Sequence, residues 1–288
     1  MKSYGLLILL VVAILPGCDV GAKKRRAVIA PASGIPAADE GWDAIGALID
    51  EGEIHDAIGQ CEVMKQKYPK SGLPYVFLQR CHQHGGDLEL ARQACLAGLE
   101  VEPGSAELHS AHADTLLEMG EAEEALKAID KGIEVEQDDP AALYYKRGYT
   151  FEHLAQFDSA ADSYRQALML DPSDFWAKNN LASILCLAPL DKDRDGVVAE
   201  TLARELVKTA LATAEDQQLT YAWDTLGSAL AEQGRFEEAI ESAQKALNTA
   251  DGEERILIER NIGHYRGQRA SRYKSDGSGD IMAGEARD

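Results

Sequence analysis

The stretch from Ala141 to Pro172, AALYYKRGYTFEHLAQFDSAADSYRQALMLDP, decides the fold. Apolar or small side chains recur in it every three or four residues, in two blocks separated by a break near Ala155 and Gln156. The two stripes consist of Tyr144, Gly148 and Phe151, and then of Ala160, Tyr164, Ala167 and Leu168. This spacing places each stripe on one face of an α-helix. The stretch therefore predicts two amphipathic helices joined by a tight turn and ended by Asp171-Pro172.

The same pattern returns along the chain with a period of 34 residues. Ala57, Ala91 and Ala125 are 34 residues apart, and Ala160 follows after 35. Two further series keep this register and shift with it: Gly52, Gly86, Gly120 and Ala155, and Pro69, Pro103, Gln137 and Pro172. One helix pair cannot bury its apolar face alone, so neighbouring units must stack. We expect units at 38–71, 72–105, 106–140, 141–174, 175–219 and 220–253.

These units resemble the tetratricopeptide repeat (TPR), whose pattern is an aromatic residue, Leu-Gly, Tyr, Ala, an aromatic residue, Ala and Pro. The fourth unit matches it at Tyr144, Gly148, Phe151, Ala160, Tyr164, Ala167 and Pro172, with Arg147 in place of leucine. The sixth matches at Trp223, Leu226, Gly227, Ala239 and Ala246, with Asp251 in place of proline. The resemblance implies an all-α fold, a right-handed TPR superhelix (solenoid) of about six helix-turn-helix repeats over 38–253. A C-terminal capping helix is expected at 254–273 and a disordered tail at 274–288.

The fifth unit departs from the period, because Ala203 lies 43 residues beyond Ala160. The surplus is expected at Pro189–Val198, which contains Arg194-Asp195-Gly196. Together with Trp223-Asp224-Thr225-Leu226, this loop is similar to a bacterial TPR subfamily with an Arg-Asp-Gly loop in its penultimate repeat. That resemblance implies that the loop is a helix-capping turn.

The N-terminus has the organisation of an export signal. Lys2 precedes an apolar run, Leu6–Leu15, that is too short to span a bilayer but suits residues 1–17 as a signal peptide. Leu15-Pro16-Gly17-Cys18 resembles the bacterial lipobox and implies lipidation of Cys18. The alternative is an ordinary secretory signal with an incidental cysteine. Lipidation predicts a protein anchored to the cell membrane that faces the periplasm or the cell exterior.

Residues 18–37 are predicted to form the lipid anchor and a flexible basic linker. Lys23, Lys24, Arg25 and Arg26 interrupt the acidic trend of the chain, and a segment with Pro31, Ser33, Gly34 and Pro36 follows. The basic cluster either contacts anionic lipid head groups or is a solvated tether.

Composition and motifs exclude several function classes. With 29 Lys and Arg against 49 Asp and Glu among 288 residues, the net charge of −20 repels phosphate backbones and disfavours nucleic acid as a partner. The sequence has no Gly-rich phosphate loop, no G-x-S-x-G and no H-E-x-x-H. No region outside the repeats is long enough for a catalytic domain. We therefore expect a non-enzyme with no cofactor and no small-molecule substrate.

Two motifs are weak metal candidates. Asp191, Asp193 and Asp195, followed by Gly196, have the D-x-D-x-D-G pattern that begins a calcium loop. Leu202 stands where that loop requires glutamate, so a capping turn is the favoured interpretation. His109 and His112 are three residues apart on one predicted helix, but their repeat positions favour packing over zinc binding.

The internal cysteines are predicted to act as small hydrophobic residues. Cys61 and Cys95 occupy the same repeat position, while Cys81 and Cys186 lie on other predicted helices. Export would leave a Cys81–Cys95 disulfide open as an alternative.

The TPR resemblance also implies a concave groove, lined by the first helix of each unit, that holds a protein or peptide partner. The implied groove residues are Arg80, His84, Tyr145, Tyr149, His153, Trp176 and Asn179. Tyr145 and Tyr149 share one helix face, whereas Tyr144 is the core residue of the same register. The Lys/Asn/Asn/Lys/Arg set of the chaperone-type carboxylate clamp is absent.

The sequence thus predicts a membrane-anchored TPR adaptor or scaffold. The first alternative is a structural component of an envelope, pilus or secretion assembly. The second is a small enzyme or a calcium-dependent switch built on the Asp191–Asp195 loop.

Overall fold

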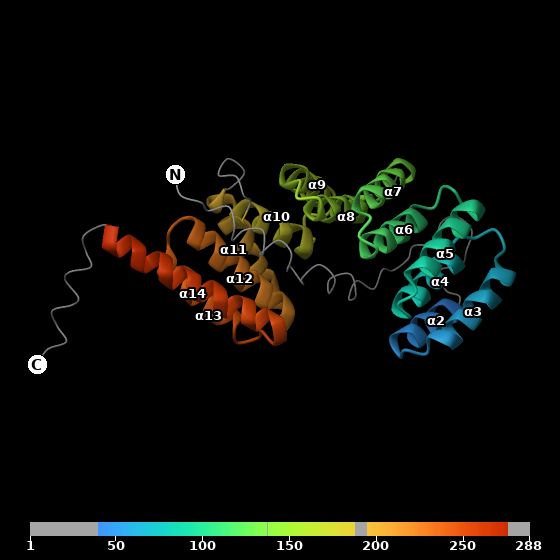
Figure 1. Ribbon diagram of the computed structural model, residues 1–288, viewed down its shortest axis with the longest axis horizontal. Coiled ribbons are helices and arrows are strands. Elements are labelled where there is room, and N and C mark those ends of the chain that lie inside the picture. Colours follow the sequence, from blue (N-terminus) through green and yellow to red (C-terminus); the bar gives the residue numbers. More distant parts are fainter. Residues whose placement is uncertain (1–39, 137, 188–194, 276–288) are drawn as a thin grey trace, which may run out of the picture. The chain divides into compact units, whose positions relative to one another are not determined.

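The computed structural model describes residues 40–136, 138–187 and 195–275, and this part of the chain is built from α-helices joined by turns (Figure 1). It divides into two compact units, residues 40–172 and 173–275 of the described chain. In the described part, no helix is long and apolar enough to cross a membrane. The prediction of an all-α array of helix pairs is confirmed.

The unit 40–172 contains four helix pairs, each packed as an antiparallel hairpin and each contacting the next along the chain. The pairs are α2 (Glu40–Asp50) with α3 (Ile54–Lys67), α4 (Leu73–His84) with α5 (Leu88–Val101), α6 (Ala106–Glu118) with α7 (Ala122–Val135), and α8 (Ala141–His153) with α9 (Phe157–Leu170). The alanines that revealed the period, Ala57, Ala91, Ala125 and Ala160, are all fully buried. A methyl group at this position lets the two helices of a pair approach closely.

The turn inside each of these pairs uses a left-handed residue at one fixed position. Gly52, Gly86 and Gly120 have φ angles of 81°, 81° and 80°, and Ala155 takes the same place at 54°. Glycine adopts this region without a Cβ penalty, whereas alanine does so at a cost. The register read from the sequence therefore corresponds to a repeated backbone conformation.

The unit 173–275 contains α10 (Phe175–Leu187) with α11 (Gly196–Thr213), α12 (Asp216–Glu232) with α13 (Phe236–Ala246), and the terminal helix α14 (Gly252–Ser275). Leu206, Leu226, Ile258 and Ile262 are buried in one apolar core that draws on α11, α12 and α14. Helix α14 packs on α13 through its apolar face, and Tyr265 joins the same core.

Part of the insertion in the fifth repeat lies in a longer helix, and residues 188–194 lie outside the described chain. α11 has 18 residues where α9 has 14, and it begins at Gly196, so the end of the predicted surplus is helical. α12 also begins at Asp216, before the expected start of the sixth unit at residue 220. The 35-residue slip before the fourth unit is different, because it leaves α8 with the same 13 residues as α6.

Candidate partner-binding site

Helix α8 carries an aromatic strip formed by Tyr145, Tyr149 and His153, which we call the α8 face. These residues follow one another at intervals of four, so they share one side of the helix. Tyr145 and Tyr149 are half-buried, and His153 is exposed. The Tyr145 ring lies 5.7 Å from the ring of Tyr164, and the Tyr149 ring meets that of His153 edge-on at 4.6 Å. The strip thus begins against the core and ends in solvent.

Polar contacts hold this part of α8 in place. Lys146 forms an ion pair with Asp114 of α6, and the Thr150 hydroxyl donates to the Lys146 carbonyl at 2.8 Å. Tyr144, expected in the core, is half-buried. The fully buried tyrosine of this repeat is Tyr164.

Beside the α8 face, the Tyr164 hydroxyl donates to a buried carboxylate. The hydroxyl lies 2.5 Å from Glu152 Oε1, and Glu152 is only 7% exposed. Burial raises the pKa of Glu152 to about 7, although the hydrogen bond from Tyr164 opposes the rise. This side chain is therefore neutral for much of its population near neutral pH.

The two predicted groove residues of the second repeat lie on α4. Arg80 is half-buried with its guanidinium 5.6 Å from the Phe77 ring centroid, and His84 is exposed. α4 is joined to α6 by a hydrogen bond from Gln79 Nε2 to Thr115 Oγ1 at 3.0 Å and by another from Gln83 to Glu118. Arg80 and His84 thus lie on the helix that contacts α6, and Lys146 joins α6 in turn to α8.

In the unit 173–275, Trp176 and Asn179 have different environments. Trp176 is half-buried and meets the Tyr221 ring of α12 edge-on at 5.4 Å. Asn179 is 7% exposed, and its Oδ1 accepts a hydrogen bond from the Thr225 hydroxyl at 2.8 Å. Its side chain thus points inward, toward α12, rather than toward a partner.

The face of α12 that meets α14 carries polar residues that were not among the predicted groove residues. Asp224 Oδ1 accepts from Asn261 at 3.3 Å, and the hydroxyls of Ser228 and Tyr265 are 3.2 Å apart. Asp224 and Ser228 occupy the fifth and ninth places of the sixth unit, the places that Tyr145 and Tyr149 occupy in the fourth unit. Burial raises the pKa of Asp224 to about 6.

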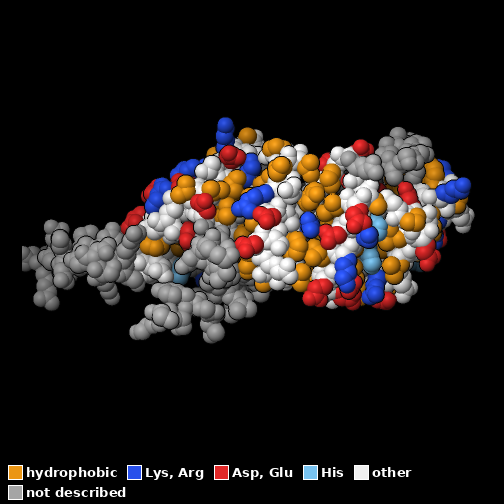
Figure 2. Space-filling model, turned by 90° about the horizontal axis from the view of Figure 1, so that it is seen from above, with side chains coloured by type: hydrophobic (Ala, Val, Ile, Leu, Met, Phe, Trp, Pro, Cys, Tyr) orange, Lys and Arg blue, Asp and Glu red, His pale blue; other side chains and the backbone are white. Residues whose placement is uncertain are grey.

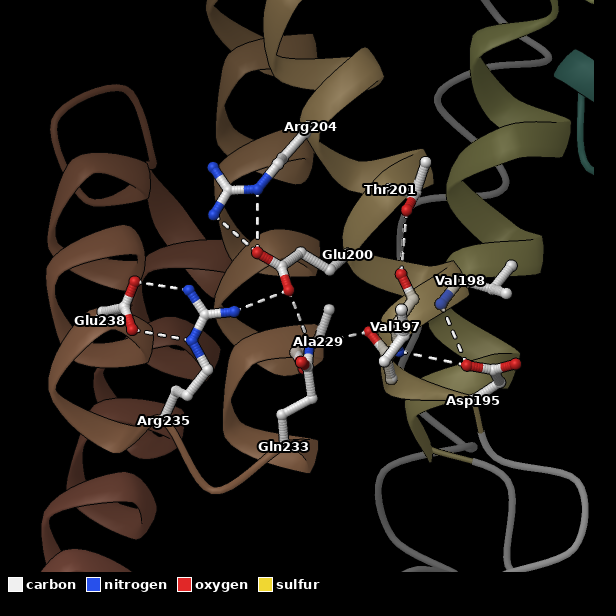
Figure 3. A network of polar contacts seen from close by, with 11 residues as sticks. Asp195, Val197, Val198, Glu200, Thr201, Arg204, Ala229, Gln233, Arg235 and Glu238 are labelled. Carbon is white, nitrogen blue, oxygen red and sulfur yellow. Dashed lines mark hydrogen bonds and ion pairs between the residues drawn. The ribbon is translucent and has the colours of Figure 1, made fainter.

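The calcium candidate coincides with a helix cap. Asp195 Oδ1 accepts hydrogen bonds from the backbone N–H groups of Val197 and Val198 at 3.2 and 3.0 Å, at the start of α11 (Figure 3). This agrees with the capping turn implied by the Arg-Asp-Gly resemblance. Asp191 and Asp193 lie outside the described residues. Among the residues that are described, no group of three or more His, Cys, Asp or Glu side chains could hold a metal ion.

The same corner is held by an ion-pair network around Glu200 of α11. Its carboxylate binds Arg204 and Arg235 at 2.6 and 2.7 Å, and Arg235 also binds Glu238 of α13 (Figure 3). Gln233 donates to the Gly196 carbonyl at 3.0 Å. A Cβ on Gly196 would lie 3.1 Å from Gln233 Cγ, so the glycine permits this close packing. The network joins α11 to the turn between α12 and α13.

His109 and His112 line an open hollow of 340 Å³ between α5, α6 and α7, with Leu96, Leu99 and Leu116 among its other walls. Burial lowers the pKa of both histidines, which favours their neutral forms. His109 Nε2 lies 3.2 Å from the Pro103 carbonyl oxygen. Figure 2 shows histidine side chains bordered by Lys, Arg, Asp and Glu on one part of the surface. The rim charges are paired with each other, as in Lys127–Glu124 at 2.7 Å.

Cys18 and the basic cluster Lys23–Arg26 lie outside the described residues. The expected lipid anchor therefore stays a prediction.

The stacked helix pairs, five of which have a left-handed residue in their turn in the described part of the chain, define a helical-repeat protein. The family models of the tetratricopeptide repeat match residues 110–175 and 220–252. The chain thus contains tetratricopeptide repeats, as its resemblance in sequence implied. No curated protein matches the sequence.

Solved structures with the same fold have low sequence identity. The pilus biogenesis factor PilW is 16% identical with a TM-score of 0.62, and the match covers 78% of this chain and 99% of PilW. YrrB, described as a TPR protein with an unusual peptide-binding site, is 16% identical with a TM-score of 0.52, over 69% of this chain and 97% of YrrB. The Cut9–Hcn1 complex of APC/C is 14% identical with a TM-score of 0.60, over 77% of this chain. This chain spans only 42% of that matched chain.

Proposed function

We propose that this protein is a membrane-anchored, non-enzymatic adaptor that binds a segment of a protein partner on its α8 face. The observation that carries the proposal is the aromatic strip of Tyr145, Tyr149 and His153, which begins against the buried Tyr164 ring. Aromatic side chains that are already held by packing lose little conformational entropy on binding, and they dominate the energetics of many interfaces.

The neighbours of the α8 face suit a partner with both apolar and polar groups. The ion pair Lys146–Asp114 and the exposed His153 provide charged and hydrogen-bonding groups beside the two tyrosines. YrrB, which has the same fold, is described as binding peptide. Arg80 and His84 on α4 extend the proposed binding surface toward the N-terminus of the unit 40–172.

Anchoring belongs to the proposal through Cys18. A lipidated Cys18, followed by the linker up to residue 37, would hold the repeats at a membrane surface while leaving them free to reach a partner. Expression of Cys18→Ala in a bacterial host should leave an unprocessed precursor of higher mass. Processing and release of this variant like the wild type would contradict the anchor.

The binding site is tested by Tyr149→Ala in the full chain. Loss of an interface aromatic residue costs about 2 kcal/mol, or about thirtyfold in affinity. We expect the variant to fold normally but to capture much less partner from detergent-solubilised membranes, measured by quantitative mass spectrometry. Met169→Ala is the matched control, because Met169 is 75% exposed on α9 of the same repeat. It should capture the same proteins as the wild type.

Two outcomes would contradict the α8 face as the binding site. One is capture by Tyr149→Ala at the level of Met169→Ala. The other is a fall in melting temperature as large as that of Tyr164→Ala, because Tyr164 is a core residue with no exposed surface.

The second candidate function is a structural part of an envelope, pilus or secretion assembly. It is favoured by the match to PilW, which covers nearly the whole of that pilus biogenesis factor. The same capture experiment separates the two functions, because a structural component should be recovered in fixed stoichiometry with its complex. Its contacts should also survive Tyr149→Ala, since a structural component would use the other helix face and the ends of the array.

A further inference from the structure

Two thiols meet inside the first apolar core of the unit 40–172. Cys61 on α3 and Cys81 on α4 have no exposed surface and belong to one core cluster. Their side chains are in hydrogen-bonding contact. This contact, together with burial, raises the pKa of Cys61, and the same contact lowers the pKa of Cys81. The sequence left open a Cys81–Cys95 bond, but the thiol beside Cys81 is that of Cys61.

The repeat geometry places these two positions in contact. Cys61 and Cys81 are 20 residues apart, as are Cys95 and Thr115 in the next repeat. Cys95 is hydrogen-bonded to the Thr115 side chain. Contact between the second helix of one repeat and the first helix of the next thus recurs at the same positions. The first pair carries two thiols, and the second carries one thiol and one hydroxyl.

We propose that Cys61 and Cys81 form a disulfide bond that fastens the first repeat to the second. The oxidant is a low-molecular-weight or protein disulfide. The Cys81 thiolate attacks one sulfur of that disulfide and releases its first thiol, and the Cys61 thiolate then attacks the Cys81 sulfur and releases the second. Cys61 and Cys81 lose two protons and two electrons in total, and the oxidant is reduced to two thiols.

Burial decides when the reaction occurs and how long its product lasts. Neither thiol is exposed in the folded chain, so exchange requires folding intermediates or local opening of the terminal helices α2 and α3. Once formed, the bond of about 2.05 Å is shielded from reductants by the same packing. Because repeats interact only with their neighbours, the bond stabilises the N-terminal end of the array in particular.

The test is to refold the full chain in a glutathione redox buffer, block free thiols with N-ethylmaleimide and map the cross-linked peptides by mass spectrometry. We expect a Cys61–Cys81 link and two fewer free thiols. We also expect a melting temperature higher by about 5–10 °C than that of the fully reduced chain, because the bond closes a short loop. Hydrogen exchange should slow most in α2 and α3.

Cys81→Thr is the matched control, because it gives the first pair the thiol and hydroxyl that Cys95 and Thr115 already have. It should fold and show no redox-dependent melting shift. Alkylation of both Cys61 and Cys81 after refolding, glutathione adducts without a cross-link, or a Cys81–Cys95 link would each overturn the proposal. None of these results bears on partner binding at the α8 face.

Discussion

The second and fourth repeats fill the same space between their helices in opposite ways. In the second, α5 contributes the small Cys95, and α4 contributes Gln79, which is 2% exposed and hydrogen-bonded to Thr115. At the equivalent positions of the fourth, α9 contributes Tyr164 and α8 contributes Gly148. The larger side chain is therefore on the first helix of the pair in the second repeat and on the second helix in the fourth repeat. The period fixes which positions meet, whereas the distribution of volume between them is particular to each repeat.

The largest expected effect comes from Gly148→Ala, which adds a methyl group to α8 at a position where the fourth repeat has no side chain. A Cβ at this position would lie 2.7 Å from Tyr164 Cε1 and 2.8 Å from its Cδ1. The ring cannot yield easily, because it is fully buried and hydrogen-bonded to Glu152. We expect destabilisation by about 2–3 kcal/mol, measured by urea unfolding.

Two further variants sharpen this result. Gly46→Ala in α2 places its Cβ where nothing lies within 4 Å, so it should be neutral or stabilising. The double variant Gly148→Ala, Tyr164→Ile copies the Ala113 and Ile129 of the third repeat and should recover part of the loss. If Gly148→Ala alone is as stable as the wild type, the close packing inferred for the fourth repeat is wrong.

The next largest effect concerns a polar position in the first helix of the same two repeats. Glu152 in the fourth repeat stands where the second repeat has Gln83. The folded-state pKa of Glu152 is raised from 4.5 to about 7, so the folded chain holds the proton more tightly than the unfolded chain. The stability that it contributes is full below pH 4.5 and is lost as the pH rises through 7. Glu152→Gln keeps an acceptor for Tyr164 and removes the charge. At pH 8 it should stabilise the chain by about 2 kcal/mol.

The measurement is the free energy of unfolding of both chains between pH 4 and pH 8 (about one pH unit per step is enough to follow a single carboxyl). Burial also raises the pKa of Glu107 to about 7 and that of Asp224 to about 6, so these carboxyls change the wild-type stability in the same direction as Glu152. The lowered pKa values of His109 and His112 act in the opposite direction. The difference between the two curves isolates Glu152. Parallel curves would show that this carboxyl does not titrate with folding.

These particular residues show how far the sequence predicts the structure. The helix pairs and the left-handed turn at Gly52, Gly86, Gly120 and Ala155 follow from the period, because each depends on spacing along one chain segment. Asn179, which the register placed among groove residues, points inward because Thr225, 46 residues away, offers its hydroxyl. The contact of Cys81 with Cys61 also depends on the orientation of two packed helices, which spacing alone does not specify.

The smallest effect concerns the turn in which the fourth repeat differs from the third. Gly120→Ala puts a side chain at φ 80°, and the conformational penalty should cost about 1 kcal/mol. Ala155→Gly makes the reverse change at φ 54°: relief of that penalty is offset by the greater freedom of glycine in the unfolded chain. We therefore expect Ala155→Gly to lie within about 0.5 kcal/mol of the wild type, or slightly above it in stability.

Both variants are compared by thermal unfolding on the same background. At Gly120 an added Cβ meets nothing within 4 Å, so steric overlap cannot explain a loss of stability there. Such a loss would be an effect of the backbone conformation. Equal and substantial losses in both variants would mean that the two turns are not equivalent. Residues at the same repeat position would then differ in the energetic cost of their backbone conformation.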